Sequence, residues 1–248
     1  MTIAILSDIH GNFQALEAVL DDLHGRSVDA TCCLGDLVGY GASPNEVVAR
    51  IRAERIPTIM GNYDDGVGFD RDDCGCAYRD EDEKARGQRS LMWTRTHTTA
   101  DHKACLRSLP AQLRLELGGR RILLVHGSPR RMNEYLFEDR PVSSFERLAA
   151  ASDADIIVFG HTHRPYTKIA GDVLFVNAGS VGKPKDGDWR ACYILVSPET
   201  VQPVEFVRVP YDLNGATRAI RATDLPHEYA ADLEHAGASV AATKGLAT

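Results

Sequence analysis

Three short apolar runs near the start of the chain each stop at a polar residue. The runs, with the residue that follows each, are 2–6 with Asp8, 30–34 with Asp36, and 57–60 with Asn62. Runs of this length without polar alternation are typical of strands that are buried on both faces. Because the carboxyl ends of parallel strands lie at one edge of a sheet, these three polar side chains are expected to meet there.

Helical patterns separate the three predicted strands. Between residues 12 and 24 the apolar side chains recur every three or four positions, and Gly25 follows as a stop signal. The sequence Ser-Pro-Asn-Glu at 43–46 is a capping-box pattern with proline at the first helical position, which predicts a helix to about residue 55. The alternation of strand and helix predicts an α/β fold.

The charged, glycine-bearing segment 64–90 predicts a loop outside the core, within an excursion that extends to about residue 110. Helical patterns occur in it at residues 79–96 and after Asp101, which is a candidate N-cap. After the excursion, the runs 113–117 and 121–125 flank two glycines, which predicts a β-hairpin.

The second half of the chain contains more strand signals than helix signals. A second capping-box pattern at 143–146 predicts a helix to about residue 151, and residues 155–159 form another buried strand run. The later apolar runs are close together and are expected to be antiparallel; they cover residues 173–176, 189–196 and 204–209. The alanine-rich tail, about 224–248, is expected to be a loose helix or disordered.

The composition is that of a soluble globular protein, and 248 residues suit a single domain over 1–248. A net charge of −7 provides no basic footprint, so extended nucleic acid is not an expected partner. No apolar run is long enough for a membrane span, and no signal peptide is visible. The six cysteines lack the spacing of a secreted disulfide framework, which favours a cytoplasmic location. Oligomeric state is not readable from the sequence.

Histidines extend the series of polar residues at strand ends. His126 follows the run 121–125, and His161 and His163 follow the run 155–159. Asp8 and His10 are two residues apart, so both side chains can point to the same side. Each residue alone can also be read as a turn, a cap or a solvated loop residue. Five strand ends that each combine glycine with a metal-type ligand favour metal binding as the common explanation.

Five short motifs together resemble the calcineurin-like metallophosphoesterase superfamily over about residues 1–210. They are Asp8-Ile9-His10-Gly11-Asn12, Gly35-Asp36, Gly61-Asn62, His126-Gly127 and Gly160-His161-Thr162-His163. The sequence is most similar to the small bacterial phosphodiesterase-like branch, in which a segment like Asn177-Ala178-Gly179-Ser180 also occurs. The resemblance implies a four-layer αββα sandwich.

The resemblance also implies a centre with two divalent metal ions. By similarity, one ion is held by Asp8, His10 and His163, the other by Asn62, His126 and His161, and Asp36 bridges them. A water or hydroxide between the ions would attack phosphorus in a small phosphoester substrate such as a nucleotide-like ester. Carboxylate, amide and imidazole ligands together suit Mn, Fe or Zn better than Ca.

Tyr63 departs from the family pattern, because many members carry a histidine directly after the motif asparagine. A phenol with a reference pKa of about 10 is a weaker general acid than imidazole. The departure therefore favours phosphodiesters over monoesters, while Tyr63 could equally be a wall residue. Candidates to replace the acid are Asp64, His97 and His102. Asn12 is a candidate substrate-binding residue, although helix capping explains it equally well.

Several alternatives stay open. The chain could be a catalytically weak or inactive metal-binding scaffold of the same fold, a phosphomonoesterase, or a dinucleoside polyphosphate hydrolase. An amidohydrolase also carries a His-x-His pair, but it needs eight alternating strands, which this sequence lacks. Cys74-Gly75-Cys76 is a candidate metal or redox pair without a second cysteine pair at zinc spacing. Lys183, Lys185 and Arg190 could attract phosphate, or they could be ordinary loop cations.

Overall fold

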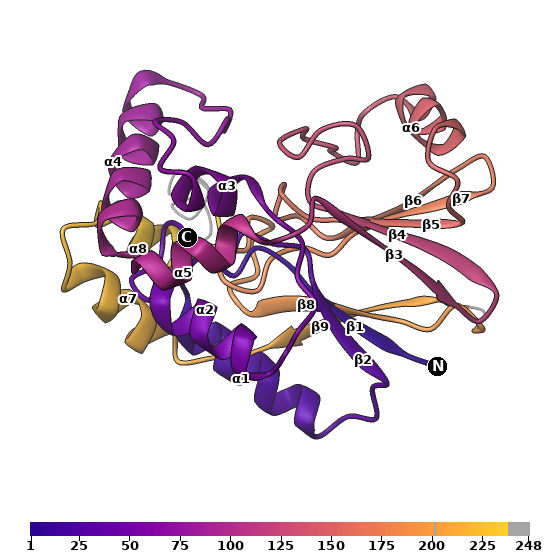
Figure 1. The fold of residues 1–248 in the computed structure, drawn as a ribbon, viewed down its shortest axis with the longest axis horizontal. Helices are drawn as coiled ribbons and strands as arrows, with labels where there is room; N and C mark the ends of the chain where they lie inside the picture. Colours follow the sequence, from indigo (N-terminus) through magenta and orange to yellow (C-terminus); the bar gives the residue numbers. More distant parts are fainter. Residues whose placement is uncertain (201, 238–248) are drawn as a thin grey trace, which may run out of the picture.

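Two β-sheets lie face to face in the middle of the molecule (Figure 1). The computed structural model describes residues 1–200 and 202–237. The first sheet has the order β2-β1-β8-β9, with strands β1 (Ile3–Leu6), β2 (Ala30–Cys33), β8 (Ala191–Val196) and β9 (Val204–Val209). The second has the order β3-β4-β5-β7-β6, with β3 (Gln112–Leu117), β4 (Arg120–Val125), β5 (Ile156–Phe159), β6 (Tyr166–Ala170) and β7 (Val173–Asn177).

Parallel pairing joins the strands whose ends carry the predicted ligands. β1 runs parallel to β2, with Ile3 opposite Ala30, and β4 runs parallel to β5, with Ile122 opposite Ile156. The predicted hairpin of β3 and β4 is confirmed, and so is the antiparallel pairing of β8 with β9. The expectation for 173–176 was wrong in part, because β7 pairs in parallel with β5 and is antiparallel only to the edge strand β6.

Successive side chains of a strand point to opposite faces of its sheet, which divides the apolar core into three layers. In β1, Ala4 and Leu6 face the helices, whereas Ile3 and Ile5 face the other sheet. The central layer lies between the sheets, and the third lies on the outer face of the second sheet. Because side chains alternate with a period of two, each sheet can be buried on both faces.

Helices cover the outer face of each sheet. The first sheet is covered by α1 (Phe13–His24), α2 (Pro44–Ala53), α7 (Leu213–Arg221) and α8 (Glu228–His235), which share its outer apolar layer. The second sheet is covered by α6 (Val142–Ala150), whose Phe145 and Leu148 pack on it. The layers therefore follow the order αββα, which confirms the expected sandwich (Figure 1).

The excursion is largely helical and stands at one end of the sandwich (Figure 1). It consists of α3 (Asn62–Gly68), α4 (Glu81–His97) and α5 (Ala100–Arg107). The prediction that 64–90 forms a loop outside the core was wrong for the first residues of this segment. Val67 of α3 is fully buried in the outer apolar layer of the first sheet. Glycines at 66 and 68 leave room for Leu91 and Leu106, so the helix packs closely with few aliphatic residues of its own.

Several predicted boundaries and caps also need correction. Residues 57–60 form no strand, and only Thr58 makes a parallel bridge to Cys33. Ser43 makes no capping hydrogen bond with its side chain, α6 begins directly after Pro141, and α5 is capped by Thr99 rather than Asp101. Backbone groups or other residues take these places, so the capping patterns indicated the helices but not their caps.

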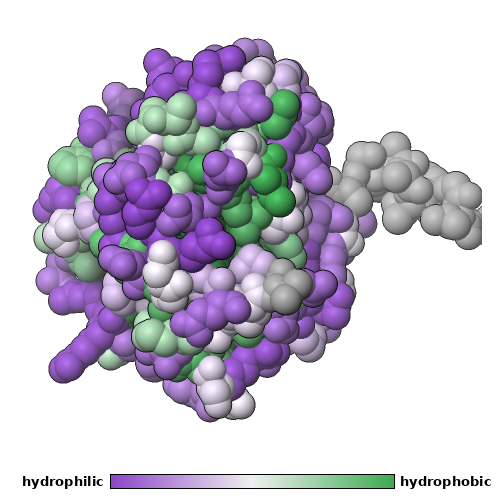
Figure 2. Space-filling view, turned by 90° about the vertical axis from the view of Figure 1, so that its right-hand side faces the viewer, coloured by the Kyte–Doolittle hydropathy of each residue, from purple (hydrophilic) through white to green (hydrophobic). Residues whose placement is uncertain are grey.

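The predicted loose tail is ordered at its beginning. Tyr229 and Leu233 of α8 are buried against the outer face of the first sheet, so residues 228–235 form a packed helix. Residues 238–248, the rest of the predicted tail, lie outside the described residues. None of the helices in the described part of the chain has the length and apolarity to cross a membrane. The molecular face in Figure 2 is mostly hydrophilic, with smaller hydrophobic groups between the polar ones.

Candidate metal centre

Five of the seven predicted ligands have a left-handed backbone conformation. Their φ angles are 53° at Asp8, 50° at His10, 52° at Asp36, 64° at His161 and 59° at His163. Positive φ is uncommon outside glycine and persists where the surrounding structure enforces it, often at functional sites. These conformations turn the chain sharply after β1, β2 and β5. The turns allow Asp8 and His10, and likewise His161 and His163, to face inward together.

The structure brings six of the seven side chains into two compact groups. In each group the ligand atoms lie within 4.8 Å of one another; the groups are Asp8, His10 and His163, and Asp36, His126 and His161. The seventh residue, Asn62, places its Oδ1 3.1 Å from Nε2 of His126. All seven side chains are at most 3% exposed. The residues that the sequence singled out therefore converge, although their role as ligands is a matter for proposal.

Backbone carbonyls determine which nitrogen of three imidazoles carries a proton. Nδ1 of each faces a carbonyl oxygen, at 3.0 Å for His10 and Val38, 2.8 Å for His126 and Leu34, and 2.5 Å for His163 and Lys183. A carbonyl oxygen can only accept, so each Nδ1 donates and each neutral ring presents a lone pair at Nε2. This second contact is the usual device that orients a metal-binding histidine.

When the rings are neutral, lone pairs face one another across the site. Nε2 of His10 lies 3.1 Å from Nε2 of His163, and Nε2 of His126 faces both Asn62 Oδ1 and, at 3.3 Å, Asp36 Oδ2. Two further buried atoms, Asp8 Oδ1 and His161 Nε2, have no hydrogen-bond partner among the described residues. Unpaired buried acceptors are costly unless something positive lies between them. The donor set thus fits divalent cations.

Asp36 belongs to the second group and also faces the first. Its Oδ2 is 3.6 Å from Nε2 of His10 in one group and 3.3 Å from Nε2 of His126 in the other. Its Oδ1 accepts a hydrogen bond from the backbone N of Tyr63 at 2.8 Å, which fixes the carboxylate. One carboxylate oxygen therefore faces both groups.

Glycines next to the ligands allow the loops to approach closely. A Cβ at Gly61 would overlap Asp36 Oδ1, and a Cβ at Gly160 would overlap Ser7 Oγ and Asp8 Oδ2. Ser7 Oγ donates to Asp8 Oδ2 at 2.5 Å, and the backbone N of His161 donates to the same oxygen at 3.0 Å, which leaves Oδ1 for the centre. Sequence reasoning missed Ser7, since a serine before an aspartate carries no distinctive signal.

Electrostatics favour neutral imidazoles at His161 and His163 beside the charged carboxylate of Asp8. Burial opposes the charge of Asp8, but the neighbouring His163 and His10 outweigh it and hold the pKa of Asp8 well below its usual range. Burial lowers the pKa of His161 and of His163 to about 3, with help from His126 and Lys185 respectively. Neutral histidine and ionised carboxylate are the forms that bind metals.

His126 behaves differently from the other two histidines. Burial disfavours its charge, but the carboxylate of Asp36 outweighs burial and raises the pKa of His126 to about 10. The site thus attracts positive charge at Nε2 of His126, which a divalent cation can supply in place of a proton.

Tyr63 forms part of the wall beside the centre. Its ring packs edge-on against His10 with centroids 5.3 Å apart and lies 4.6 Å from the ring of Tyr40. The residue is buried, and its hydroxyl has no hydrogen-bond partner within the described ranges. Burial raises the pKa of Tyr63 well above 10, which makes the phenol a still weaker acid. Its catalytic role stays a prediction.

None of the three alternative acids, Asp64, His97 and His102, offers a free proton donor to the two groups. Asp64 is fully buried and accepts from the backbone N of Asp36 and Leu37, at 2.7 and 2.9 Å. Burial and the charge of Asp36 raise the pKa of Asp64 to about 7. His97 is stacked on Trp93, and His102 faces Asn45 Oδ1 at 2.8 Å. Asp64 therefore positions the loop after β2, a role that sequence reasoning did not foresee.

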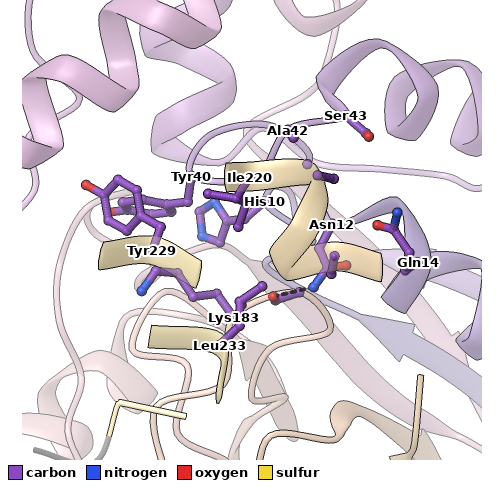
Figure 3. Close-up of a pocket in the computed structure, with 15 residues that line it drawn as sticks. His10, Asn12, Gln14, Tyr40, Ala42, Ser43, Lys183, Ile220, Tyr229 and Leu233 are labelled. Atoms are coloured by element: carbon purple, nitrogen blue, oxygen red, sulfur yellow. Dashed lines mark hydrogen bonds between the residues drawn. The ribbon is translucent and has the colours of Figure 1, made fainter. Parts of the chain in front are cut away.

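Asn12 caps α1 beside a pocket next to His10 (Figure 3). Its Oδ1 accepts from the backbone N of Ala15 at 3.1 Å, and its Nδ2 donates to the carbonyl of Gly182 at 2.9 Å. Both polar ends of Asn12 are engaged, so its substrate-binding role stays a prediction without geometric support. The pocket is also lined by Tyr40 and Tyr229, which sequence reasoning did not single out.

The excursion and one loop of the second sheet cover the centre. Asn62 Nδ2 donates to the carbonyl of Cys74 at 3.0 Å. From the other side, the ring of Tyr135 lies 4.0 Å from that of His161, and Tyr135 Oη accepts from the backbone N of Ala77 at 3.4 Å. These contacts cover Asn62 and His161 from two sides.

Comparison with known proteins points to one family. Residues 1–200 match the family model described as the calcineurin-like phosphoesterase superfamily domain. An uncharacterised protein of Methanocaldococcus jannaschii is 34% identical over 90% of this chain and 93% of its own length. A crystal structure of a metallophosphoesterase from Sphaerobacter thermophilus is 31% identical, with a TM-score of 0.76, and covers 95% of this chain and 99% of its own.

A characterised bacterial enzyme is more distantly similar. The phosphodiesterase YfcE of Escherichia coli is 26% identical over 76% of this chain and 83% of its own length. This similarity agrees with the small bacterial phosphodiesterase-like branch that the motifs predicted.

Proposed function

The chain belongs to the calcineurin-like phosphoesterase superfamily of metal-dependent hydrolases, and we propose that it cleaves phosphodiesters with two divalent cations. One cation would be held by Asp8, His10 and His163, and the other by Asn62, His126 and His161, with Asp36 shared between them. The position of Asp36 Oδ2 carries the proposal, since the same oxygen lies 3.6 Å from Nε2 of His10 and 3.3 Å from Nε2 of His126.

When bound, the divalent cations would lower the pKa of a nearby water and neutralise the charge on the phosphoryl oxygens. The chain's own residues hold this arrangement. Asp8 and Asp36 supply negative charge, and the backbone carbonyls behind the histidines fix the direction of each lone pair. Burial of the ligands keeps bulk water out and strengthens their electrostatic effect on the substrate.

The donor set narrows the choice of metal. Two carboxylates, one amide oxygen and four imidazoles form a mixed oxygen and nitrogen set. Such a set suits Mn, Fe or Zn, whereas Ca prefers oxygen alone and soft metals prefer thiolate. Manganese is the metal we expect to support activity in vitro.

The position after Asn62 favours diesters over monoesters. Tyr63 is buried and its pKa is raised well above 10, so it cannot readily protonate a departing alkoxide. Esters whose leaving group needs no proton are affected least by this lack. A small, nucleotide-like diester is the proposed substrate, and the net charge of −7 disfavours a long nucleic acid.

The test is hydrolysis of a generic aryl phosphodiester with added Mn²⁺. We expect turnover by the wild type and its loss in Asp36→Ala and His126→Ala, with activity retained in the matched variant His97→Ala on the exposed end of α4. A matrix of metals against monoesters, diesters, cyclic nucleotides and dinucleoside polyphosphates then defines the substrate. Tight metal binding without turnover of any of these esters would replace the enzyme by a metal-binding scaffold.

Tyr63→His tests the leaving-group argument separately. A histidine in the acid's position should raise monoester hydrolysis, and more for alkyl than for aryl esters, because general acid catalysis contributes roughly 10²–10⁴-fold. If the ratio of alkyl to aryl rates does not change, Tyr63 does not occupy the position of an acid.

A further inference from the structure

Two thiols meet beside the proposed centre. Cys74 and Cys76 place their Sγ atoms 3.0 Å apart. Gly75 between them has a φ of +69°, and a Cβ there would overlap the side chain of Asn133. Only glycine allows this tight turn without strain, and the turn brings the two thiols to the same side. None of the other four cysteines has such a contact with another thiol in the described ranges.

The same turn holds the side chain of Asn62. Its Nδ2 donates to the carbonyl of Cys74 at 3.0 Å and to Sγ of Cys76 at 3.3 Å. With its nitrogen held on this side, the amide directs Oδ1 toward His126, 3.1 Å away. The orientation of a proposed metal ligand therefore depends on the position of the Cys76 sulfur.

Cys76 can be reached from solvent, whereas Cys74 lies behind it. A surface pocket is lined by Cys76 together with residues of the excursion and the first turns of α4, including Tyr78, Arg79 and Lys84. Cys76 is half-buried, and Cys74 is buried. An accessible thiol with a second thiol in contact is the arrangement of a redox-sensitive pair.

We propose that Cys74 and Cys76 are an oxidisable dithiol whose disulfide withdraws the sulfur contact of Asn62 and weakens metal binding. The oxidant is hydrogen peroxide. The Cys76 thiol attacks one peroxide oxygen, which leaves a sulfenic acid on Cys76 and releases one water. The Cys74 thiol then attacks that sulfur, forms the S–S bond and releases a second water. The two thiols lose two electrons in total, and peroxide gains them.

Closing the disulfide must move at least one of the two sulfurs, and Cys76, which lines the surface pocket, is the one with room to move. The two Sγ atoms have to approach from 3.0 Å to the covalent distance of about 2.05 Å. A disulfide sulfur in a new position is also a poorer acceptor for the Asn62 amide than a thiol. Loss of an outer contact of this kind typically reduces metal affinity about 10–100-fold. A disulfide ring of so few residues is strained, so thiols should reduce it readily and the effect is reversible.

The dependence of metal affinity on the dithiol rests on the proposed role of Asn62 as a ligand. The test therefore reads the disulfide and the metal affinity directly, without hydrolysis. The full chain is stripped of metal, treated with hydrogen peroxide, and examined by peptide mass mapping and by calorimetric titration with Mn²⁺. Dithiothreitol then reverses the treatment. Cys105→Ser, a partly exposed cysteine on α5, is the matched control, and Cys74→Ser removes the second thiol.

We expect a mapped Cys74–Cys76 disulfide, a 10–100-fold weaker Mn²⁺ affinity, and recovery of both with dithiothreitol. Cys105→Ser should behave like the wild type, and Cys74→Ser should form no disulfide at Cys76. Absence of the disulfide, or a disulfide that leaves Mn²⁺ affinity unchanged, overturns the inference. A reduced chain that binds Mn²⁺ tightly but hydrolyses no ester counts against the proposed function alone.

Discussion

His163→Ala should remove about half of the stability that metal ions give to the protein. In the wild type, Nε2 of His163 lies 3.1 Å from Nε2 of His10 and 3.3 Å from Oδ1 of Asp8, in the group proposed to hold one of the two ions. Alanine leaves that group with two ligands. The other group, built around His126, keeps all of its ligands.

The size of this stabilisation follows from the thermodynamic linkage between metal binding and folding. An ion present at a hundredfold excess over its Kd stabilises the folded state by about 2.7 kcal/mol, so two ions contribute about 5 kcal/mol. In a chain of this length each kcal/mol moves Tm by about 2–4 °C, which makes the full shift roughly 10–20 °C. The variant should retain about half of it. Without metal, alanine loses the bond to the Lys183 carbonyl but also removes the contact between two lone pairs, so the net change is only about 1 kcal/mol.

The assay is thermal unfolding of wild type and variant, each with chelator and with Mn²⁺, and the difference between the two shifts isolates the metal term. His97→Ala is the matched control, because this exposed histidine stacks on Trp93 and belongs to neither group. Equal Mn²⁺-induced shifts in His163→Ala and the wild type would refute the assignment of His163 as a ligand.

Three further variants test other parts of the structure. Gly61→Ala should weaken Mn²⁺ binding at least about tenfold in calorimetry, because the new Cβ displaces Asp36 Oδ1. Gly119→Ala is its control: the new Cβ meets open space, so the variant should lose only about 1 kcal/mol of stability. Asn12→Ala should lower stability by about 1–2 kcal/mol in urea unfolding and leave KM for the aryl diester unchanged; a raised KM would instead assign it to substrate binding.

The third variant is Glu134→Gln. Burial opposes the charge of Glu134, but contacts with Arg130, Ser128 and Arg140 outweigh burial and lower the pKa of Glu134 to about 2. A lowered pKa stabilises the fold above the unfolded value of about 4.3, and this contribution disappears as pH falls toward 2. Urea unfolding should therefore show a deficit of roughly 1–3 kcal/mol at pH 6 that shrinks at acidic pH.

The strands and the sandwich could be predicted because their signals are local. Consecutive apolar residues such as those of β1 and β5 are readable without knowledge of their neighbours, and period-two alternation then accounts for both faces. The edge strand β6 escaped notice because only its first and last residues are buried and Ile169 is 70% exposed. Helix α3 escaped because its glycines and aspartates favour loops in isolation, and close packing against α5 overrides that preference.

The residues that support the site could not be predicted, because their partners are distant in the sequence. Asp64 accepts from the backbone of Asp36, 28 residues away, and its motif position suggests no such role. Asn177 was noted only through family resemblance. In the structure its Nδ2 donates to the carbonyl of Gly160 and to Thr162 Oγ1, both at 2.9 Å, so it holds the loop that carries His161 and His163. The role of such polar residues becomes apparent only when the folded chain places the loops side by side.

Strain at the ligand positions links metal binding to folding. Five residues with positive φ cost roughly 1 kcal/mol or more each, which in total approaches the 5–15 kcal/mol that a whole domain retains as net stability. Hydrogen bonds between the loops offset part of this cost: the backbone N of Asp8 donates to Gly35, that of His10 to Asp36, and that of Gly11 to Leu37, at 2.8–3.0 Å. Since these bonds join the loops after β1 and β2, neither strained turn can relax without disturbing the other. The facing lone pairs of His10 and His163 add a cost that no backbone bond offsets. A cation removes that remaining cost, so relief of this repulsion contributes to the thermal shift expected for Mn²⁺.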